Sequence, residues 1–255
     1  MAEVEVISYT DPACPWSWAS EPVLRRLQAQ FADSVRITYV MAGMAREISD
    51  PHEMLLSGLD AAAASGMPVD ARGWGGREGR APRSTYPACL AVKAAQEQGD
   101  AIGAAYLRVL REGFWLRRGT LDTPDALETA ARAVSGLDGA RFAIDVRSSA
   151  IAEAFGADLE RARGLPLPSF DVDGARVEGG AEALLAAVAA AGAQPRPQLP
   201  DPAQVLRAAP ATTAEVAAAT GLAWPRAEHA LWTLALEFAA RPERIGGGVL
   251  WHAAT

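Results

Sequence analysis

Residues 11–18 read Asp-Pro-Ala-Cys-Pro-Trp-Ser-Trp and stand where a strand pattern gives way to a helix pattern. Before them, residues 4–9 are β-branched and apolar, which is typical of a buried strand. After them, apolar residues continue at helical spacing through Leu27. Pro15 suits the first helical position because it has no N–H to lose there, so Cys14 is predicted to be the N-cap of the helix.

The position of Cys14 predicts a reactive thiol. Free N–H groups and the positive end of the helix dipole favour a thiolate, so we expect a lowered pKa. Ser17 returns to the same helix face and can offer its hydroxyl to the sulfur. Because Ser17 takes the place of the second cysteine of a Cys-x-x-Cys motif, the site cannot close an internal disulfide. The alternative is a small buried apolar residue, as most free cysteines are. The strand, turn, Cys-Pro pair and helix in one run favour the reactive interpretation.

Composition and charge disfavour several classes of protein. The chain has 255 residues, a formal net charge of −7 and 50% hydrophobic residues, which describes a globular protein. Its acidic balance disfavours nucleic acid as a partner. Two cysteines do not make a disulfide framework, and three scattered histidines predict no metal site. The acidic, strand-like start and the lack of a run of about 18 apolar residues predict a cytoplasmic protein without a membrane partner.

The first part of the chain reads as an α/β unit followed by helices. Residues 35–40 predict a second strand, so that residues 1–45 form a βαβ unit with parallel strands. Pro22 removes an N–H inside the helix, and a kink is expected there. Residues 46–150 are predicted to be a helical insertion, with a loop at the glycine-rich stretch 71–80. Its clearest helix has apolar residues at every fourth position, namely Ile102, Tyr106, Leu110 and Phe114.

The strand signal returns in residues 151–194. Asp173-Gly174 lies between two short strand-like runs and predicts a tight hairpin. A helix over 181–190 would then pack back on the sheet. Four prolines mark residues 195–202 as a semi-rigid linker.

Residues 203–255 predict a small module of helix, turn, helix and hairpin that resembles a winged helix. The pair Thr212 and Glu215 predicts a capping box, and Gly246-Gly247-Gly248 predicts the hairpin turn. The second helix carries Glu228 and Glu237 and little positive charge, so phosphate contacts would be poor. We therefore expect this module to dock on the rest of the chain, on a second subunit or on a protein partner.

Three separated motifs resemble the DsbA family of thioredoxin-fold proteins, in the branch of the FrnE-like proteins and the YjbH-type protease adaptors. They are the stretch 11–16, the segment Ser-Thr-Tyr-Pro-Ala at 84–88, and Leu-Pro-Ser-Phe at 167–170. The resemblance spans about residues 3 to 192. It implies a thioredoxin fold with a large α-helical insertion, to which the winged-helix-like module is added.

The resemblance also implies roles for named residues. Cys14 would be the nucleophilic thiol, with Pro15 and Trp16 beside it on the substrate-facing surface. The Leu167-Pro168 bond would be cis, and the backbone of Leu167 would pair with an extended substrate. Ser17 departs from the redox members, so the expected chemistry is monothiol exchange or isomerisation through mixed disulfides that an external thiol such as glutathione resolves. No bound cofactor is expected, and glutathione would be a co-substrate.

Two alternative functions stay open. Kappa-class glutathione transferases and hydroxychromene-carboxylate isomerases have a related Ser-Pro-Tyr-Ser-Trp-like run, and residues 15–18 lie between the two patterns; such a protein would activate glutathione without an essential cysteine. The other alternative is a non-catalytic protein adaptor of the YjbH type. Cys89 is expected to be a core cysteine rather than a distant resolving thiol.

Overall fold

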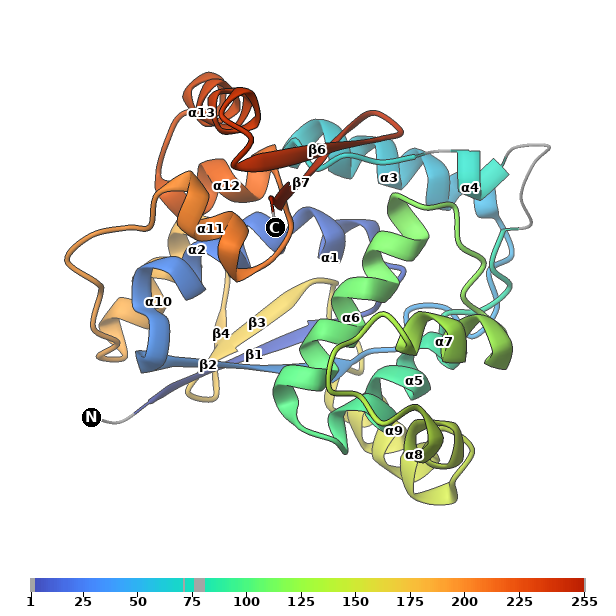
Figure 1. The fold of residues 1–255 in the computed structure, drawn as a ribbon. Coiled ribbons are helices and arrows are strands. Elements are labelled where there is room, and N and C mark those ends of the chain that lie inside the picture. The colour runs from blue at the N-terminus through green and yellow to red at the C-terminus, as the bar shows by residue number, and fades with distance from the viewer. Residues whose placement is uncertain (1–2, 71, 76–80, 255) are drawn as a thin grey trace.

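The central sheet of the computed structural model, which describes residues 3–70, 72–75 and 81–254, has four strands in the order β2-β1-β3-β4 (Figure 1). Strands β1 (Val4–Thr10) and β2 (Val35–Met41) are parallel, as the βαβ pattern predicts. Strand β3 (Ser169–Val172) runs antiparallel to β1 and forms a hairpin with β4 (Ala175–Val177). The expected turn is confirmed, since Asp173 and Gly174 both have positive φ, 45° and 82°.

One face of the sheet is covered by helices from both ends of the α/β unit. Helix α2 (Glu21–Phe31) and helix α10 (Ala181–Ala190) bury their apolar side chains against β1 and β3. A one-turn 3-10 helix, η1 (Ala32–Ser34), leads into β2. Instead of the kink expected at Pro22, the chain forms a separate short helix, α1 (Pro15–Ala19), and restarts α2 after Ser20. Pro22 lies in the first turn of α2, where its missing N–H costs no helical hydrogen bond.

The insertion between β2 and β3 is helical, as predicted. The periodic residues Tyr106, Leu110 and Phe114 are buried in the core of the insertion. The glycine-rich stretch 71–80, which was expected to be a loop, contains the short helix α4 at 72–75. The other residues of this stretch lie outside the described part of the chain. Helix α9 crosses the boundary expected at residue 150 and covers the second face of the sheet near β2. The helices are α3 (Pro51–Ser65), α4 (Arg72–Gly75), α5 (Tyr86–Gln96), α6 (Asp100–Trp115), α7 (Pro124–Ala131), α8 (Gly139–Asp145) and α9 (Ser149–Arg161).

The C-terminal module contains one helix more than the sequence pattern predicts. Pro202 begins helix α11 inside what reads as the end of the linker, because Asp201 and Gln204 form a capping box around it. The capping box of Thr212 and Glu215 is confirmed. A three-stranded sheet in the order β5-β7-β6 completes the module. Its elements are α11 (Pro202–Ala208), β5 (Ala211–Thr212), α12 (Thr213–Thr220), α13 (Trp224–Leu236), β6 (Ala240–Ile245) and β7 (Gly248–Ala253).

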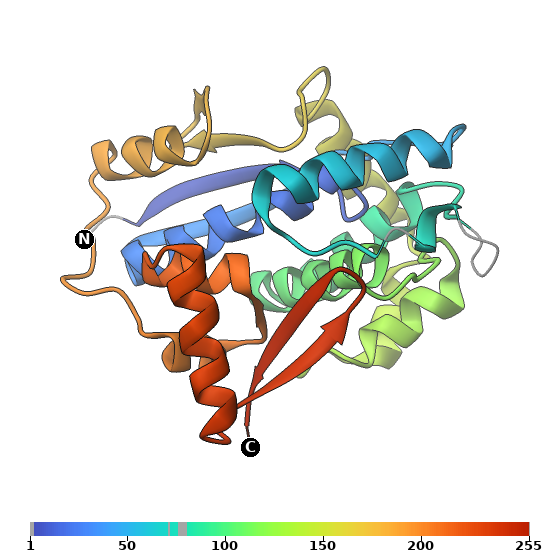
Figure 2. The same ribbon diagram turned by 90° about the horizontal axis from the view of Figure 1, so that it is seen from above.

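The module lies against the rest of the chain. Helix α12 packs along α2, and the β6–β7 hairpin extends toward the segment that follows α3 (Figures 1 and 2). Across the described ranges, no helix combines the length and apolar character needed to cross a bilayer.

Candidate thiol site

Cys14 lies at the junction of β1 and α1. A tight turn follows the strand, closed by a hydrogen bond from the backbone N–H of Cys14 to the carbonyl of Asp11 at 3.2 Å. Cys14 is the N-cap of α1, with extended backbone angles of φ −67° and ψ 121°, and Pro15 starts the helix. The local sequence therefore places the thiol at a helix N-terminus, as predicted.

The thiol of Cys14 is withdrawn from water, which changes its acidity. Cys14 is 2% exposed, and this burial raises the pKa of its thiol. The hydroxyl and backbone N–H of Ser17 act in the opposite direction, the charge of Asp11 raises the pKa further, and burial outweighs the favourable donors. The lowered pKa expected from the sequence is therefore wrong, because the helix N-terminus acts on a buried sulfur.

Ser17 lies one turn after Cys14 on the same short helix. Its side chain is fully buried, and its Oγ has no hydrogen-bond partner among the residues that the structure describes. Because this hydroxyl favours the charged form of Cys14, it is available to donate to a thiolate there. Ser17 can therefore stabilise a thiolate at Cys14, but it cannot act as a second thiol.

The loop before β3 forms the opposite wall of the site. The Leu167-Pro168 peptide bond is cis, and the Leu167 carbonyl oxygen lies 4.0 Å from the Sγ atom of Cys14. The hydroxyl of Ser169 donates to the carbonyl of Pro166 at 2.5 Å and closes this turn. Two segments that are more than 150 residues apart in the sequence thus meet at the sulfur.

Two cavities flank the side chain of Trp16. The first, of about 620 Å³, is lined by Cys14, Pro15, Trp16 and Leu167 together with residues of the insertion and the charged side chains of Glu160 and Arg163 near the end of α9. The second, of about 790 Å³, is lined by Trp16 and Pro168. Trp16 is 42% exposed between them, whereas Trp18 is 1% exposed and belongs to the core. The predicted substrate-facing residues therefore lie together, around a half-exposed tryptophan.

Asp11 is a site residue that the sequence reading missed. Its buried carboxylate accepts hydrogen bonds from four donors, one in its own turn and three from segments that are distant in the sequence. Burial raises the pKa of Asp11, and these hydrogen bonds lower it in part. Asp11 ties the turn before Cys14 to the insertion; the donors are Ala13 N (2.8 Å), Met44 N (2.7 Å), Thr85 Oγ1 (2.6 Å) and Cys89 Sγ (3.3 Å).

Cys89 is the fully buried thiol that was expected in the core of the insertion. Burial raises its pKa well above the ordinary value, and the neighbouring charge of Asp11 adds to the rise. Both cysteines are free. Within the described residues, no cluster of three or more His, Cys, Asp or Glu side chains could hold a metal ion.

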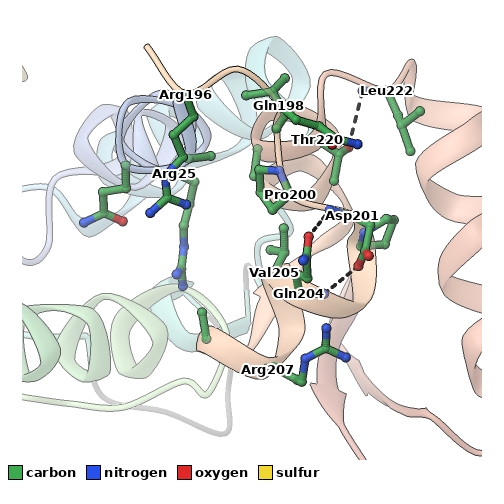
Figure 3. A pocket seen from close by; sticks show the side chains of 16 residues that line it. Arg25, Arg196, Gln198, Pro200, Asp201, Gln204, Val205, Arg207, Thr220 and Leu222 are labelled. Carbon is green, nitrogen blue, oxygen red and sulfur yellow. Dashed lines mark hydrogen bonds between the residues drawn. The ribbon is translucent and has the colours of Figure 1, made fainter. Parts of the chain in front are cut away.

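A larger cavity lies away from the thiol. It has a volume of about 900 Å³, opens to solvent and is bordered by α2, the segment 196–202, α11 and α12 (Figure 3). Arg25 and Arg196 lie along one wall, opposite Asp201 and Gln204. None of the site residues expected from the sequence lines this cavity, so the volume of a cavity does not identify the thiol site.

Comparisons with known proteins agree with this arrangement. Residues 7–170 match the family model described as Thioredoxin. Among curated proteins, the chain is similar to the ClpXP adapter protein SpxH of Halalkalibacterium halodurans, with 31% identity over 180 residues that cover 67% of this chain and 56% of the relative. The chain spans about half the length of the curated relatives it matches.

Solved structures share the fold. A candidate protein disulfide isomerase from Nitrosomonas europaea superposes with a TM-score of 0.63 and 17% identity, over 74% of this chain and 97% of that chain. The cytosolic disulfide reductase DsbM of Pseudomonas aeruginosa gives a TM-score of 0.57 and 21% identity, over 68% and 87% of the two chains. A second structure of that reductase, with glutathione, gives a TM-score of 0.54 and 19% identity over 65% and 84%.

Proposed function

The chain belongs to the thioredoxin family, and from its DsbA-like fold with a helical insertion we propose that it exchanges thiols and disulfides through a single cysteine, Cys14. The observation that carries the proposal is the meeting of the Cys14 sulfur and the Leu167 carbonyl across one cavity. Ser17 in place of a second cysteine limits the chemistry to mixed disulfides.

The exchange has two steps. The Cys14 thiolate attacks one sulfur of a disulfide; the new sulfur–sulfur bond forms while the old one breaks, and the other half leaves as a thiolate that takes a proton from water. A second thiol then attacks the mixed disulfide and releases Cys14 as a thiolate. Glutathione suits the second step, and the glutathione-containing structure of the related DsbM reductase supports this choice.

The surroundings of Cys14 set the rate that we expect. Because burial raises the pKa of its thiol, only a small share is ionised at neutral pH, and exchange should be slow there and faster at alkaline pH. Trp16 would cover one side of the bound disulfide, and the backbone of Leu167 would pair with an extended chain on the other. We therefore expect the chain to exchange disulfides slowly through one thiol and to bind its substrate in one cavity.

Incubation with oxidised glutathione, followed by mass spectrometry of the intact protein, tests the proposal. We expect one glutathione adduct, located on Cys14 by peptide mapping and removed by excess reduced glutathione. Cys89→Ser should keep the adduct and Cys14→Ser should lose it. The absence of an adduct on Cys14 at pH 9 would reject the exchange mechanism. A glutathione-dependent transferase activity that survives in Cys14→Ser would favour the kappa-class type instead.

A protein-adaptor role is the second candidate, because curated relatives that the chain matches are ClpXP adapter proteins. An adaptor of this kind would use its surface and not its thiol. Purified candidate partners that bind equally well to Cys14→Ala and to the unchanged chain, in the absence of any disulfide or glutathione chemistry, would support the adaptor role over the exchanger.

A further inference from the structure

The C-terminal module contacts residues that hold Trp18, a buried side chain beside the thiol site. Trp18 lies one turn after Cys14 on α1, and its backbone N–H donates to the Cys14 carbonyl at 3.1 Å. Its ring is 1% exposed and its indole N–H donates to the carbonyl of Pro68 at 2.9 Å. The guanidinium of Arg108 lies over the ring, 4.8 Å from its centroid. Because α1 is only five residues long, a shift of Trp18 moves Cys14 with it.

The module holds Arg108 from one side. Glu215, at the start of α12, is fully buried and forms two hydrogen bonds to the Arg108 guanidinium, at 2.6 and 3.0 Å. Arg108 also pairs with Glu21 at 3.1 Å and with Glu112 at 2.7 Å. Such bidentate, charge-assisted pairs fix the plane of a guanidinium. Glu215 therefore helps, together with Glu21 and Glu112, to fix where the cation that covers Trp18 lies.

The module also covers the segment 66–70, which supplies the carbonyl that Trp18 binds. The Thr212 hydroxyl lies 3.2 Å from the sulfur of Met67. The ring of Trp224 packs on Gly66, so closely that an added Cβ there would meet it at 2.8 Å. At the hairpin turn, a Cβ on Gly248 would come within 2.5 Å of Pro68. The approach of the hairpin to this segment is visible in Figure 2.

We propose that the C-terminal module acts as a clamp on the thiol site: through Glu215 and the β6–β7 turn it fixes Trp18, and thereby keeps Cys14 buried. Glu215, Arg108 and Trp18 are then positioning residues, and the state of the module controls access to the sulfur. This inference concerns the accessibility of the thiol and holds whether or not Cys14 exchanges disulfides.

The chain provides a matched pair of variants for the β6–β7 turn. Gly248→Ala places a methyl group against Pro68, whereas Gly247→Ala places one at ordinary contact distance, 3.6 Å from the carbonyl oxygen of Val69. Neither glycine has a positive φ, so both substitutions suit the backbone. Glu215→Gln tests the other route, with Asp145→Asn in the exposed Arg141–Asp145 pair of α8 as its control.

The measurement is the rate of alkylation of each cysteine by iodoacetamide across a pH series. We expect iodoacetamide to alkylate Cys14 several-fold faster in Glu215→Gln and in Gly248→Ala than in the unchanged chain. The apparent pKa of the Cys14 thiol should also be lower in both variants, because the sulfur is less buried. The two controls should match the unchanged chain. Cys89, fully buried on α5, should stay protected in every variant and thereby reports general unfolding.

Two results would overturn the clamp. One is an unchanged Cys14 rate in Glu215→Gln and Gly248→Ala, and the other is a parallel rise for Cys14 and Cys89. If Glu215→Gln does not fold, Arg117→Gln serves instead, because the half-exposed Arg117–Glu243 pair ties β6 to the segment after α6 at 2.7 Å. An unchanged Cys14 rate in that variant and in Gly248→Ala would equally reject the proposal.

Discussion

The Sγ atom of Cys14 faces the carbonyl oxygen of Leu167 at 4.0 Å, so the loop before β3 presents an acceptor to the sulfur. A carbonyl oxygen can receive the S–H of a neutral thiol and gives no support to a thiolate. The donors that would support the charged form belong to α1, namely Ser17 and the backbone of the first turn. The site as folded therefore favours the protonated sulfur.

The alkylation rate of Cys14 should consequently rise at higher pH values than the alkylation rate of an ordinary cysteine. Burial raises the pKa of the thiol, so the thiolate fraction and the rate should rise about tenfold per pH unit through pH 8. Iodoacetamide rates for Cys89→Ser from pH 6 to pH 10 measure this directly. A rate that is already constant below pH 7 would contradict it.

Ser17→Cys should convert the site into one that closes an internal disulfide. The new thiol would take the second position of a Cys-Pro-Trp-Cys motif, and Ser17 Oγ has no hydrogen bond to lose in the described structure. After oxidation, two thiols should disappear in a thiol titration, and no stable glutathione adduct should remain. Ser20→Cys, at the next helix start, is the control and should keep both the adduct and its thiols.

Sequence reasoning reached the local features of this chain and, through the family resemblance, the cis Leu167-Pro168 bond, and it missed other features that need distant partners. Pro15 and the pair Thr212 and Glu215 carry their signal within a few residues, and the structure has both as predicted. The sulfur of Cys14 faces a loop 153 residues away, and three of the four donors to Asp11 come from 33 to 78 residues away. No periodicity or spacing expresses such contacts. Helix α11 was missed for a local reason, since its prolines resemble those of a linker.

Glu215 should make the stability of the fold sensitive to acid. Burial alone would raise its pKa, but Arg108 and Arg25 outweigh burial and lower the pKa from 4.5 to about 2. The carboxylate therefore stabilises the folded chain above pH 4.5, and this contribution is lost as the pH falls toward 2. Thermal denaturation at several pH values should show a steeper loss below pH 4.5 than in Glu215→Gln. Equal pH profiles for the two proteins would reject this role.

The packing of the insertion gives a prediction with opposite signs at two glycines. In α3, a Cβ on Gly58 would lie 2.4 Å from the ring of Trp115, which is fully buried and stacks on Trp74 at 4.8 Å. Trp115 cannot move away without disturbing that stack. Gly58→Ala should therefore lower the free energy of unfolding by about 1–3 kcal/mol.

Gly156, in the middle of α9, is the matched site because an added Cβ there meets nothing within 4 Å. Gly156→Ala should raise the free energy of unfolding by about 0.5–1 kcal/mol, since alanine loses less backbone entropy in a helix. Urea denaturation of the two variants beside the unchanged chain measures both effects. A rise in the free energy of unfolding for both would mean that helix propensity outweighs the Trp115 contact, and it would remove Gly58 as a packing determinant of the insertion.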